Sequence, residues 1–150
     1  MFVQSQIKIS ASKEKVWNVI SNIENAADVF SDIKNIQIVD RPQNGLIGLR
    51  WKEIREFMGK DAEETMWITD AVINKFYTSE AKNSGCLYHS SLVLEECDEG
   101  VWVSKTFKST PETFLAKILA PMMRLMQGTM RKCLARDLED IKNYCEKIAS

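Results

Sequence analysis

Histidine is almost absent from this chain, and its cysteines are not spaced like metal ligands. His89 is the only histidine, and none of the four cysteines forms a Cys-x-x-Cys pair with another. Because zinc sites need several such ligands close together, we expect no metal site. The N-terminal segment also lacks a secretory pattern, since Lys8 interrupts it before an apolar stretch forms. The sequence therefore predicts reduced thiols and a cytoplasmic location.

Long apolar runs and an excess of basic charge are also missing. The most apolar helical stretch, residues 114–126, is short and contains Lys117 and Arg124, so we expect no membrane span. The formal net charge is -1, and nucleic-acid-binding domains usually carry a basic face. We therefore expect no nucleic-acid partner.

Known catalytic motifs are absent as well. The chain has no Gly-x-Ser-x-Gly elbow and no glycine-rich phosphate loop. Cys86 and Cys133 have no histidine beside them in the sequence, and no carboxylate pair stands out as an acid and base. The sequence predicts no cofactor and favours a protein without catalysis, although it does not decide the question.

What the sequence does contain is one domain, residues 1–150, rich in alternating segments. Residues 2–9 alternate as a first strand, and Ser12 is the expected N-cap of a helix that carries Val16, Trp17 and Ile20. A second short helix is expected over residues 26–30. Six further strands follow, joined mostly by hairpin turns, so the sheet should be antiparallel; they are residues 33–39, 46–57, 62–72, 76–81, 86–94 and 101–107.

A long amphipathic helix closes the chain. Thr110 is its expected cap and Pro111 its first residue. Apolar residues then recur at spacings of three and four from Leu115 to Ile148, as one face of a helix requires. Pro121 lies within this pattern, and we expect a kink or break there.

This order of elements resembles the helix-grip fold of the START/Bet v1-like (SRPBCC) superfamily, and within it the polyketide cyclase/dehydrase-type branch. The matching segments are residues 9–17, 48–59, 100–103 and 134–142. The resemblance implies an α+β fold in which a curved, seven-stranded antiparallel sheet wraps around the C-terminal helix, with two short helices after the first strand. It also implies a cavity between sheet and helix. Relatives include lipid carriers, metabolite binders, aromatic cyclases and chaperone activators, so the fold does not choose a function.

If such a cavity exists, inward strand positions and the helical stripe should line it. The expected lining residues are Trp51, Met66, Ile68, Tyr88, Ser90, Leu92, Lys105, Phe107, Met122, Met126 and Met130. The alternative is that these residues fill an ordinary core. The cluster of methionines favours a flexible wall that adapts to a ligand, although methionine also fills gaps in ordinary cores.

Four charged residues could also face this cavity. Strand alternation places Lys105 with Phe107 and Glu64 with Met66, but a buried pair would be costly. Either the two side chains pair inside the cavity, which would keep Lys105 in its lining, or a one-residue shift of register places both in solvent, which we favour. Glu53 and Arg55 would enter the cavity if their strand carried a bulge.

Three functions remain open. The leading hypothesis is a binder or carrier of a small hydrophobic molecule, such as a lipid, an isoprenoid or an aromatic metabolite. The second is a cyclase or dehydratase that acts on a polyketide-like substrate through Tyr88, Lys105 or Arg55. The third is a regulatory module or homodimer that uses Trp67 and Trp102 on the outer face of the sheet. His89 is expected on that outer face too.

Overall fold

The computed structural model describes the backbone of residues 1–149 and the side chains of residues 1–147. Its elements follow one another as β1 (Phe2–Ile9), α1 (Lys13–Ser21), η1 (Ile23–Asn25), α2 (Ala26–Val29), β2 (Ile33–Asp40), β3 (Arg50–Phe57), β4 (Lys60–Val72), β5 (Phe76–Asn83), β6 (Cys86–Cys97), β7 (Gly100–Pro111), α3 (Phe114–Arg124) and α4 (Gln127–Ala149).

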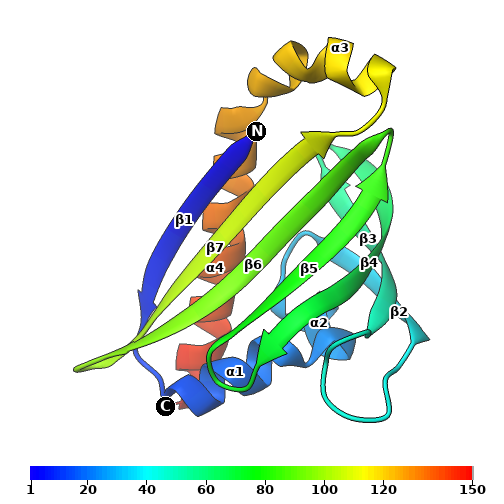
Figure 1. Cartoon of the computed structure of the whole chain (residues 1–150). Helices are drawn as coiled ribbons and strands as arrows, with labels where there is room; N and C mark the ends of the chain where they lie inside the picture. Colours follow the sequence, from blue (N-terminus) through cyan, green and yellow to red (C-terminus); the bar gives the residue numbers. More distant parts are fainter. Residues whose placement is uncertain (150) are drawn as a thin grey trace.

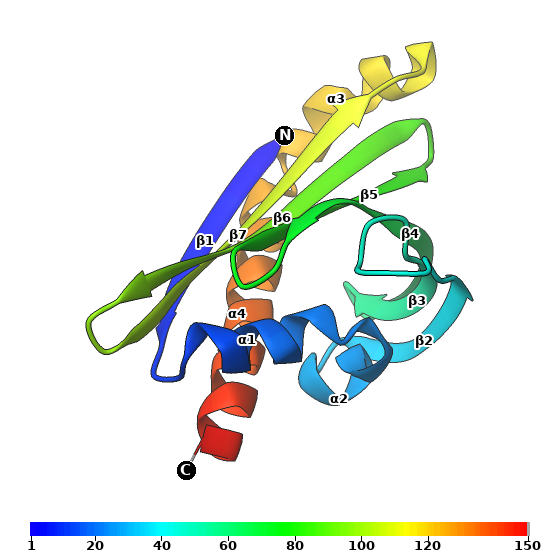
Figure 2. The same ribbon diagram turned by 60° about the horizontal axis from the view of Figure 1, so that its bottom comes forward.

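The seven strands form one antiparallel sheet in the order β1-β7-β6-β5-β4-β3-β2. The sheet curves around α4, while α1 and α2 cover one end of its concave face and α3 crosses the other end (Figures 1 and 2). This is the α+β helix-grip architecture that the sequence predicts.

The first helix begins as expected. The Ser12 hydroxyl accepts a hydrogen bond from the Lys15 backbone N–H at 3.2 Å, which satisfies one of the free donors of the first turn. Val16, Trp17 and Ile20 are the buried residues of α1, and they pack into the main core.

The C-terminal helical segment differs from the prediction. It forms two helices, α3 and α4, and the turn lies at Leu125 and Met126 rather than at Pro121, which α3 accommodates. At this turn the backbone N–H groups of Leu125 and Met126 bond three residues back, to Met122 and Met123. The tighter bonding ends the first helix and redirects the chain.

The expected start of that segment is also wrong. Pro111 ends β7, opposite Cys86, instead of opening a helix. Thr113 is the N-cap, and its hydroxyl accepts from the Ala116 N–H at 3.2 Å. A proline is tolerated at the last position of a strand because no further ladder bond depends on its missing N–H.

The core fills only one end of the concave face. There α1, α2 and the second half of α4 pack onto the sheet, and Leu138, Ile141 and Cys145 of α4 are at most 1% exposed. Toward α3 the helix and the sheet diverge. The space between them is the candidate site.

Candidate functional site

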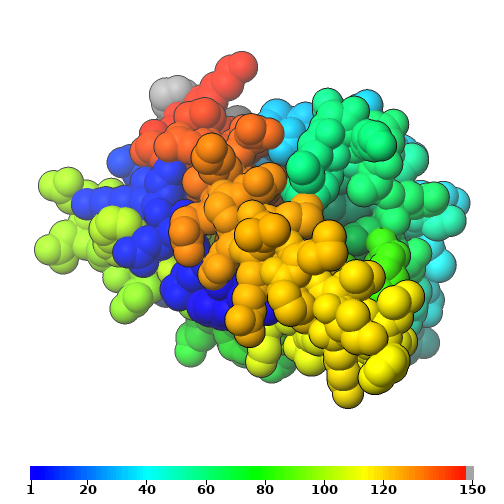
Figure 3. All heavy atoms as spheres, turned by 90° about the horizontal axis from the view of Figure 1, so that it is seen from above, coloured from blue at the N-terminus to red at the C-terminus, as the bar shows by residue number. Residues whose placement is uncertain are grey.

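A cavity of about 310 Å³ lies between the sheet and the segment that joins α3 to α4. Strands β3, β4, β6 and β7 supply one wall, and residues of α3, α4 and their connecting turn supply the other. Most of the lining is apolar; it includes Phe57, Met66, Phe107, Met123, Met126, Met130 and Leu134. In Figure 3, which looks onto this end of the molecule, the surface is recessed between α4 in orange and the green-cyan strands.

The structure brings seven of the expected lining residues together. They are Met66, Tyr88, Ser90, Lys105, Phe107, Met126 and Met130. Within this set, the rings of Tyr88 and Phe107 are stacked with their centroids 5.5 Å apart. Cys86 and Met123 also meet at this end, with their sulfur atoms 3.9 Å apart.

Four expected lining residues lie elsewhere. Trp51, Ile68 and Leu92 point to the same face of the sheet and belong to the core cluster, and Trp51 and Leu92 also line a smaller cavity described below. Strand alternation determines which face a side chain occupies, not how far along that face the helices cover it. Met122 is 65% exposed on the outside of α3, and its neighbour Met123 lines the cavity instead. The expected apolar stripe of α3 faces outward, and of this helix only Met123 lines the cavity.

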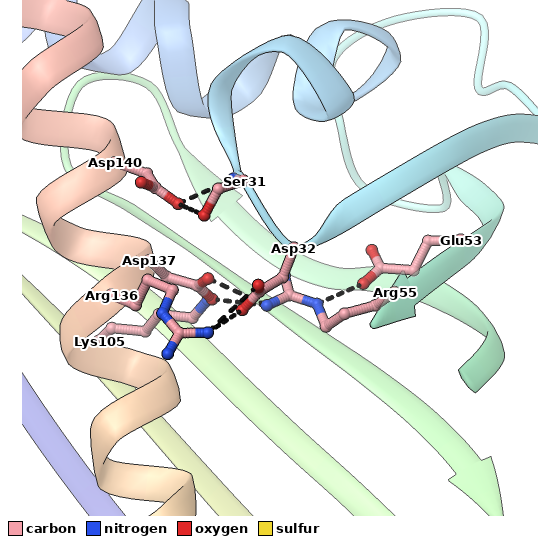
Figure 4. Close-up of polar contacts among 8 residues, drawn as sticks. All are labelled: Ser31, Asp32, Glu53, Arg55, Lys105, Arg136, Asp137 and Asp140. Atoms are coloured by element: carbon pink, nitrogen blue, oxygen red, sulfur yellow. Dashed lines mark hydrogen bonds and ion pairs between the residues drawn. The ribbon is translucent and has the colours of Figure 1, made fainter. Parts of the chain in front are cut away.

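A cluster of four charged side chains forms the inner end of the cavity (Figure 4). Asp137 of α4 is 2% exposed. It accepts two hydrogen bonds from Arg55 Nη1, at 2.9 and 3.1 Å, and a further one from Lys105 Nζ. The Arg55 Nε donates to Glu53 at 3.3 Å, and Glu53 in turn accepts from the Trp51 indole N–H at 3.1 Å. The cluster therefore ties α4 to both halves of the sheet.

The charges of this cluster balance, since it holds two carboxylates and two cations. Burial alone would raise the pKa of Asp137, but Lys105 and Arg55 together hold that pKa below its ordinary value. Burial would also lower the pKa of Arg55, and Asp137 and Glu53 reverse that shift. The Phe30 ring lies below both cations, 6.0 Å from the Arg55 guanidinium carbon and 5.5 Å from Lys105 Nζ.

These positions correct two expectations about charge. Lys105 is not in solvent, because Asp137 provides the partner that its burial requires. Glu64 also lines the cavity instead of facing bulk water. Glu53 and Arg55 reach the cavity without a bulge in their strand, since the β3–β4 register is regular from Arg50 to Phe57. The irregularity lies across from them in β2, between Ile33 and Asn35.

Two groups in the cavity wall have pKa values shifted by their surroundings. Burial, reinforced by the charge of Glu53, raises the pKa of Glu64 above its ordinary value. Burial raises the pKa of Tyr88 to about 12. Both shifts favour the protonated form, and in that form a carboxyl or a phenol can donate a hydrogen bond to a bound molecule.

A smaller cavity of about 70 Å³ lies on the other side of the charged cluster. The smaller cavity extends to Phe30 and Tyr77. The residues that line both cavities are Glu53, Arg55, Met66, Ser90 and Lys105. Burial raises the pKa of the Tyr77 phenol as well. The charged cluster thus lies between a large cavity and a small one, and both have mostly apolar walls.

A second set of contacts holds α4 to the segment between α2 and β2. Asp140 accepts from the Ser31 backbone N–H and hydroxyl, both at 2.8 Å, and Arg136 contacts Asp32 at 3.1 and 3.2 Å (Figure 4). Successive turns of α4 are therefore fixed on the side facing α2, close to Asp137.

The remaining sequence candidates lie away from the cavity. Trp102 is 38% exposed on the outer face of the sheet, and the Trp67 ring is covered by the Arg50 guanidinium, 4.9 Å from its centroid. His89 faces the same side, opposite Glu80. All four cysteines are free thiols. Within the described residues, no group of acidic, histidine and cysteine side chains is arranged to hold a metal, and no helix is long and apolar enough to cross a membrane.

Asp137 is the functional residue that sequence reasoning missed. It stands three residues after Leu134 and four before Ile141, so it falls on the apolar stripe of α4. A lone acid on a buried stripe requires a cationic partner. That was the available signal, but it does not say which of the 20 lysines and arginines provides the partner.

Comparison with known proteins identifies the fold. No family model matches the chain, and no curated protein was found to be similar in sequence. A protein from Thermus thermophilus superposes with a TM-score of 0.82, at 16% identity over the whole of both chains. An aromatase/cyclase from Streptomyces sp. R1128 superposes with a TM-score of 0.80, at 13% identity over 100% of this chain and 96% of that one.

A START superfamily protein from Mycobacterium smegmatis superposes with a TM-score of 0.76, at 14% identity over 95% of this chain and 97% of that one. These identities are too low to transfer an activity, but the architecture agrees along nearly the full length. The chain has the START/Bet v1-like (SRPBCC) helix-grip fold.

Proposed function

We propose that this protein binds a small, largely apolar molecule that carries at least one oxygen acceptor. The single observation that carries the proposal is the cavity of about 310 Å³, whose walls are apolar and whose inner end is charged. Ligand pockets of this kind place most of the ligand against apolar walls and orient it with a few polar groups.

The size of the cavity limits the ligand. Its volume is that of roughly ten water molecules, which suits a compact molecule of roughly 10–20 non-hydrogen atoms. Each methylene that leaves water contributes about 0.8 kcal/mol. After the costs of association, we expect a dissociation constant in the micromolar range.

The polar end of the cavity favours an acceptor on the ligand. Arg55 has five N–H donors, and its described hydrogen bonds use the Nε and Nη1 groups. Its Nη2 donors are left for the cavity that the side chain lines. A carbonyl, hydroxyl or carboxylate oxygen would match them. Long acyl chains, isoprenoids and fused aromatic rings differ in shape, and the methionine wall can adapt to each.

Native mass spectrometry of the protein purified from its own cells tests the proposal. We expect a stoichiometric small-molecule adduct that organic extraction releases. Met130→Trp, which fills the cavity, should remove the adduct. Met122→Trp makes the same change on the exposed side of α3 and should retain it. An adduct that survives Met130→Trp would show that the molecule binds elsewhere.

A second candidate function is a cyclase or dehydratase reaction on a polyketide-like substrate. Glu64 and Tyr88 favour it, because both line the cavity and burial raises the pKa of each above its ordinary value. The resemblance of the fold to an aromatase/cyclase supports the substrate class. Lys105 is a poor choice of acid or base here, because Asp137 already binds it.

The enzyme hypothesis has its own test. Glu64→Gln preserves the shape of the side chain but cannot transfer a proton. If the protein is an enzyme, this variant should bind a polyketide-like substrate as the wild type does and lose turnover. If turnover of that substrate is unchanged in Glu64→Gln and also in Tyr88→Phe, neither group is the proton donor.

A further inference from the structure

The helix α3 exposes a large apolar surface that the rest of the chain does not cover. Ala116 is its only buried residue. Six large apolar side chains, five on α3 and one directly after it, are between 43% and 85% exposed. They are Phe114, Leu115, Ile118, Leu119, Met122 and Leu125. Single exposed apolar residues are ordinary, but a continuous group of this size usually marks a contact surface.

These six residues share one side of the helix. At about 100° per residue they fall within an arc of roughly 140°. Lys117 and Arg124 lie together outside that arc, and Met123 turns toward the cavity. In Figures 1 and 3, α3 (yellow) lies across the end of the molecule as its outermost element. The apolar arc therefore points away from the protein and is open to a flat partner.

The charge around this arc selects the partner. Between Thr113 and Arg136 the sequence contains five lysines and arginines and no acidic residue, although the whole chain has a net charge of -1. Lys117, Arg124, Arg131 and Lys132 are all exposed. The ion pairs of the described residues include Arg136, bound to Asp32, but none of these four. This end of the molecule is therefore locally basic.

We infer that α3 docks this protein onto the surface of an anionic lipid bilayer. A helix with an apolar arc and basic residues on its polar side lies in the headgroup region, with the arc inserted and the cations at the phosphates. Two copies of this chain meeting through the same arc would bring Lys117 and Arg124 of each copy close together. That repulsion disfavours the homodimer and favours a partner with negative charge.

Docking would also set the position of the cavity. Met123 of α3 and Met126 of the following turn line it, so the same short segment forms both the membrane-facing arc and part of the cavity wall. The entrance would lie at the bilayer surface. This inference stands on the exposed arc and its charge, and it does not depend on the ligand proposed above.

Flotation with lipid vesicles tests the inference. The full chain is mixed with vesicles of phosphatidylcholine containing about 30% phosphatidylglycerol, or of phosphatidylcholine alone, at low and high salt. We expect binding to the anionic vesicles at low salt, and a large loss on raising the salt or omitting phosphatidylglycerol.

Two double variants of the α3 region separate the contributions of the apolar side chains and of the cations to membrane binding. Phe114→Ser with Leu125→Ser should weaken binding at least tenfold, since it removes the two most exposed apolar side chains of the arc. Lys117→Gln with Arg124→Gln should weaken binding to anionic vesicles by roughly 25-fold, at about fivefold for each cation. Because all four side chains are exposed, circular dichroism and the unfolding temperature should not change.

Ile73→Ser with Lys75→Gln is the matched control. It removes one apolar and one basic side chain from the turn between β4 and β5 at the opposite end of the sheet, and it should bind like the wild type. Three results would overturn the inference: no flotation of the wild type with anionic vesicles, flotation that the α3 variants do not reduce, or a wild-type dimer in light scattering that Phe114→Ser with Leu125→Ser dissociates.

Discussion

Replacing Asp137 with asparagine should destabilise the protein strongly, although the two side chains have nearly the same shape. Asp137 is 2% exposed and receives hydrogen bonds from Arg55 and Lys105. The change leaves two buried cations with Glu53 as the only carboxylate of the cluster. Removing one partner of a buried ion pair costs about 3–5 kcal/mol, because the remaining charge is uncompensated. For a domain of this size the melting temperature should fall by about 6–20 °C.

Urea denaturation followed by circular dichroism measures this loss, and urea is preferable to a guanidinium salt because it does not screen charge. Asp140→Asn is the matched control. It makes the same change one turn later on α4, where the partner is Ser31 and the contact is exposed, so its effect should stay within about 1 kcal/mol. If the two variants lose equal amounts, the buried cluster does not hold α4 to the sheet.

The pH dependence of the difference in unfolding free energy between wild type and Asp137→Asn provides a second check. The folded-state pKa of Asp137 lies below the ordinary value of 3.8. The ionised carboxylate therefore contributes its full stability above about pH 3.8, and this contribution is lost as the pH falls through the lower folded value. The unfolding free energies of wild type and Asp137→Asn should differ by a constant amount from pH 7 to about pH 5, and the two values should then converge in acid. A difference that grows on acidification would refute the assignment.

Three further predictions follow from packing and exposure. Ile141→Ala in the fully buried face of α4 should cost about 2–5 kcal/mol in urea denaturation, whereas Ile118→Ala on the exposed arc of α3 should cost less than about 0.5 kcal/mol. Gly100→Ala should destabilise measurably, because its Cβ would lie 2.1 Å from the Ile9 carbonyl oxygen, and a stability equal to wild type would mean that β1 and β7 separate there easily. Cys145 is fully buried and its thiol pKa is raised to about 11 by burial, so mass spectrometry after brief iodoacetamide treatment should find it unmodified while Cys97 reacts.

Local patterns were sufficient to predict most of the strands and helices, and the resemblance of their order to the helix-grip fold supplied the architecture. Most strands alternate between apolar and polar residues, and β2 to β6 are each followed by a turn that contains Gly, Asn or Asp. These signals require only neighbouring residues. The Ser12 cap and the first strand are examples in which local chemistry decides the structure. Boundaries were less certain where two signals competed. Pro111 is favourable at the start of a helix, but β7 continues to pair with β6 as far as Pro111. The helix therefore begins later, with Thr113 as its cap.

The candidate site was only partly predictable, because it depends on contacts between distant residues. The inward face of each strand followed from alternation, so Tyr88, Ser90 and Phe107 were placed on the cavity side. Whether a position on that face lies in the core or beside a cavity depends on where α1 and α2 cover the sheet, so Ile68 belongs to the core while Trp51 and Leu92 line the smaller cavity. The partnership of Lys105 with Asp137 spans 32 residues of sequence, and no local pattern encodes it.

The charged cluster is difficult to explain by stability alone. Apolar residues of similar volume often stabilise a protein as well as a buried ion pair does, because taking charges out of water is costly. Here the cluster occupies the border between two cavities, and its carboxylates hold Arg55 and Lys105 in place while the charges balance. Such an arrangement presents fixed hydrogen-bond donors without a net charge. It would orient an oxygen on an apolar ligand more effectively than it would attract an ion, which is why we expect the ligand of this cavity to be largely apolar and to place its oxygen at Arg55.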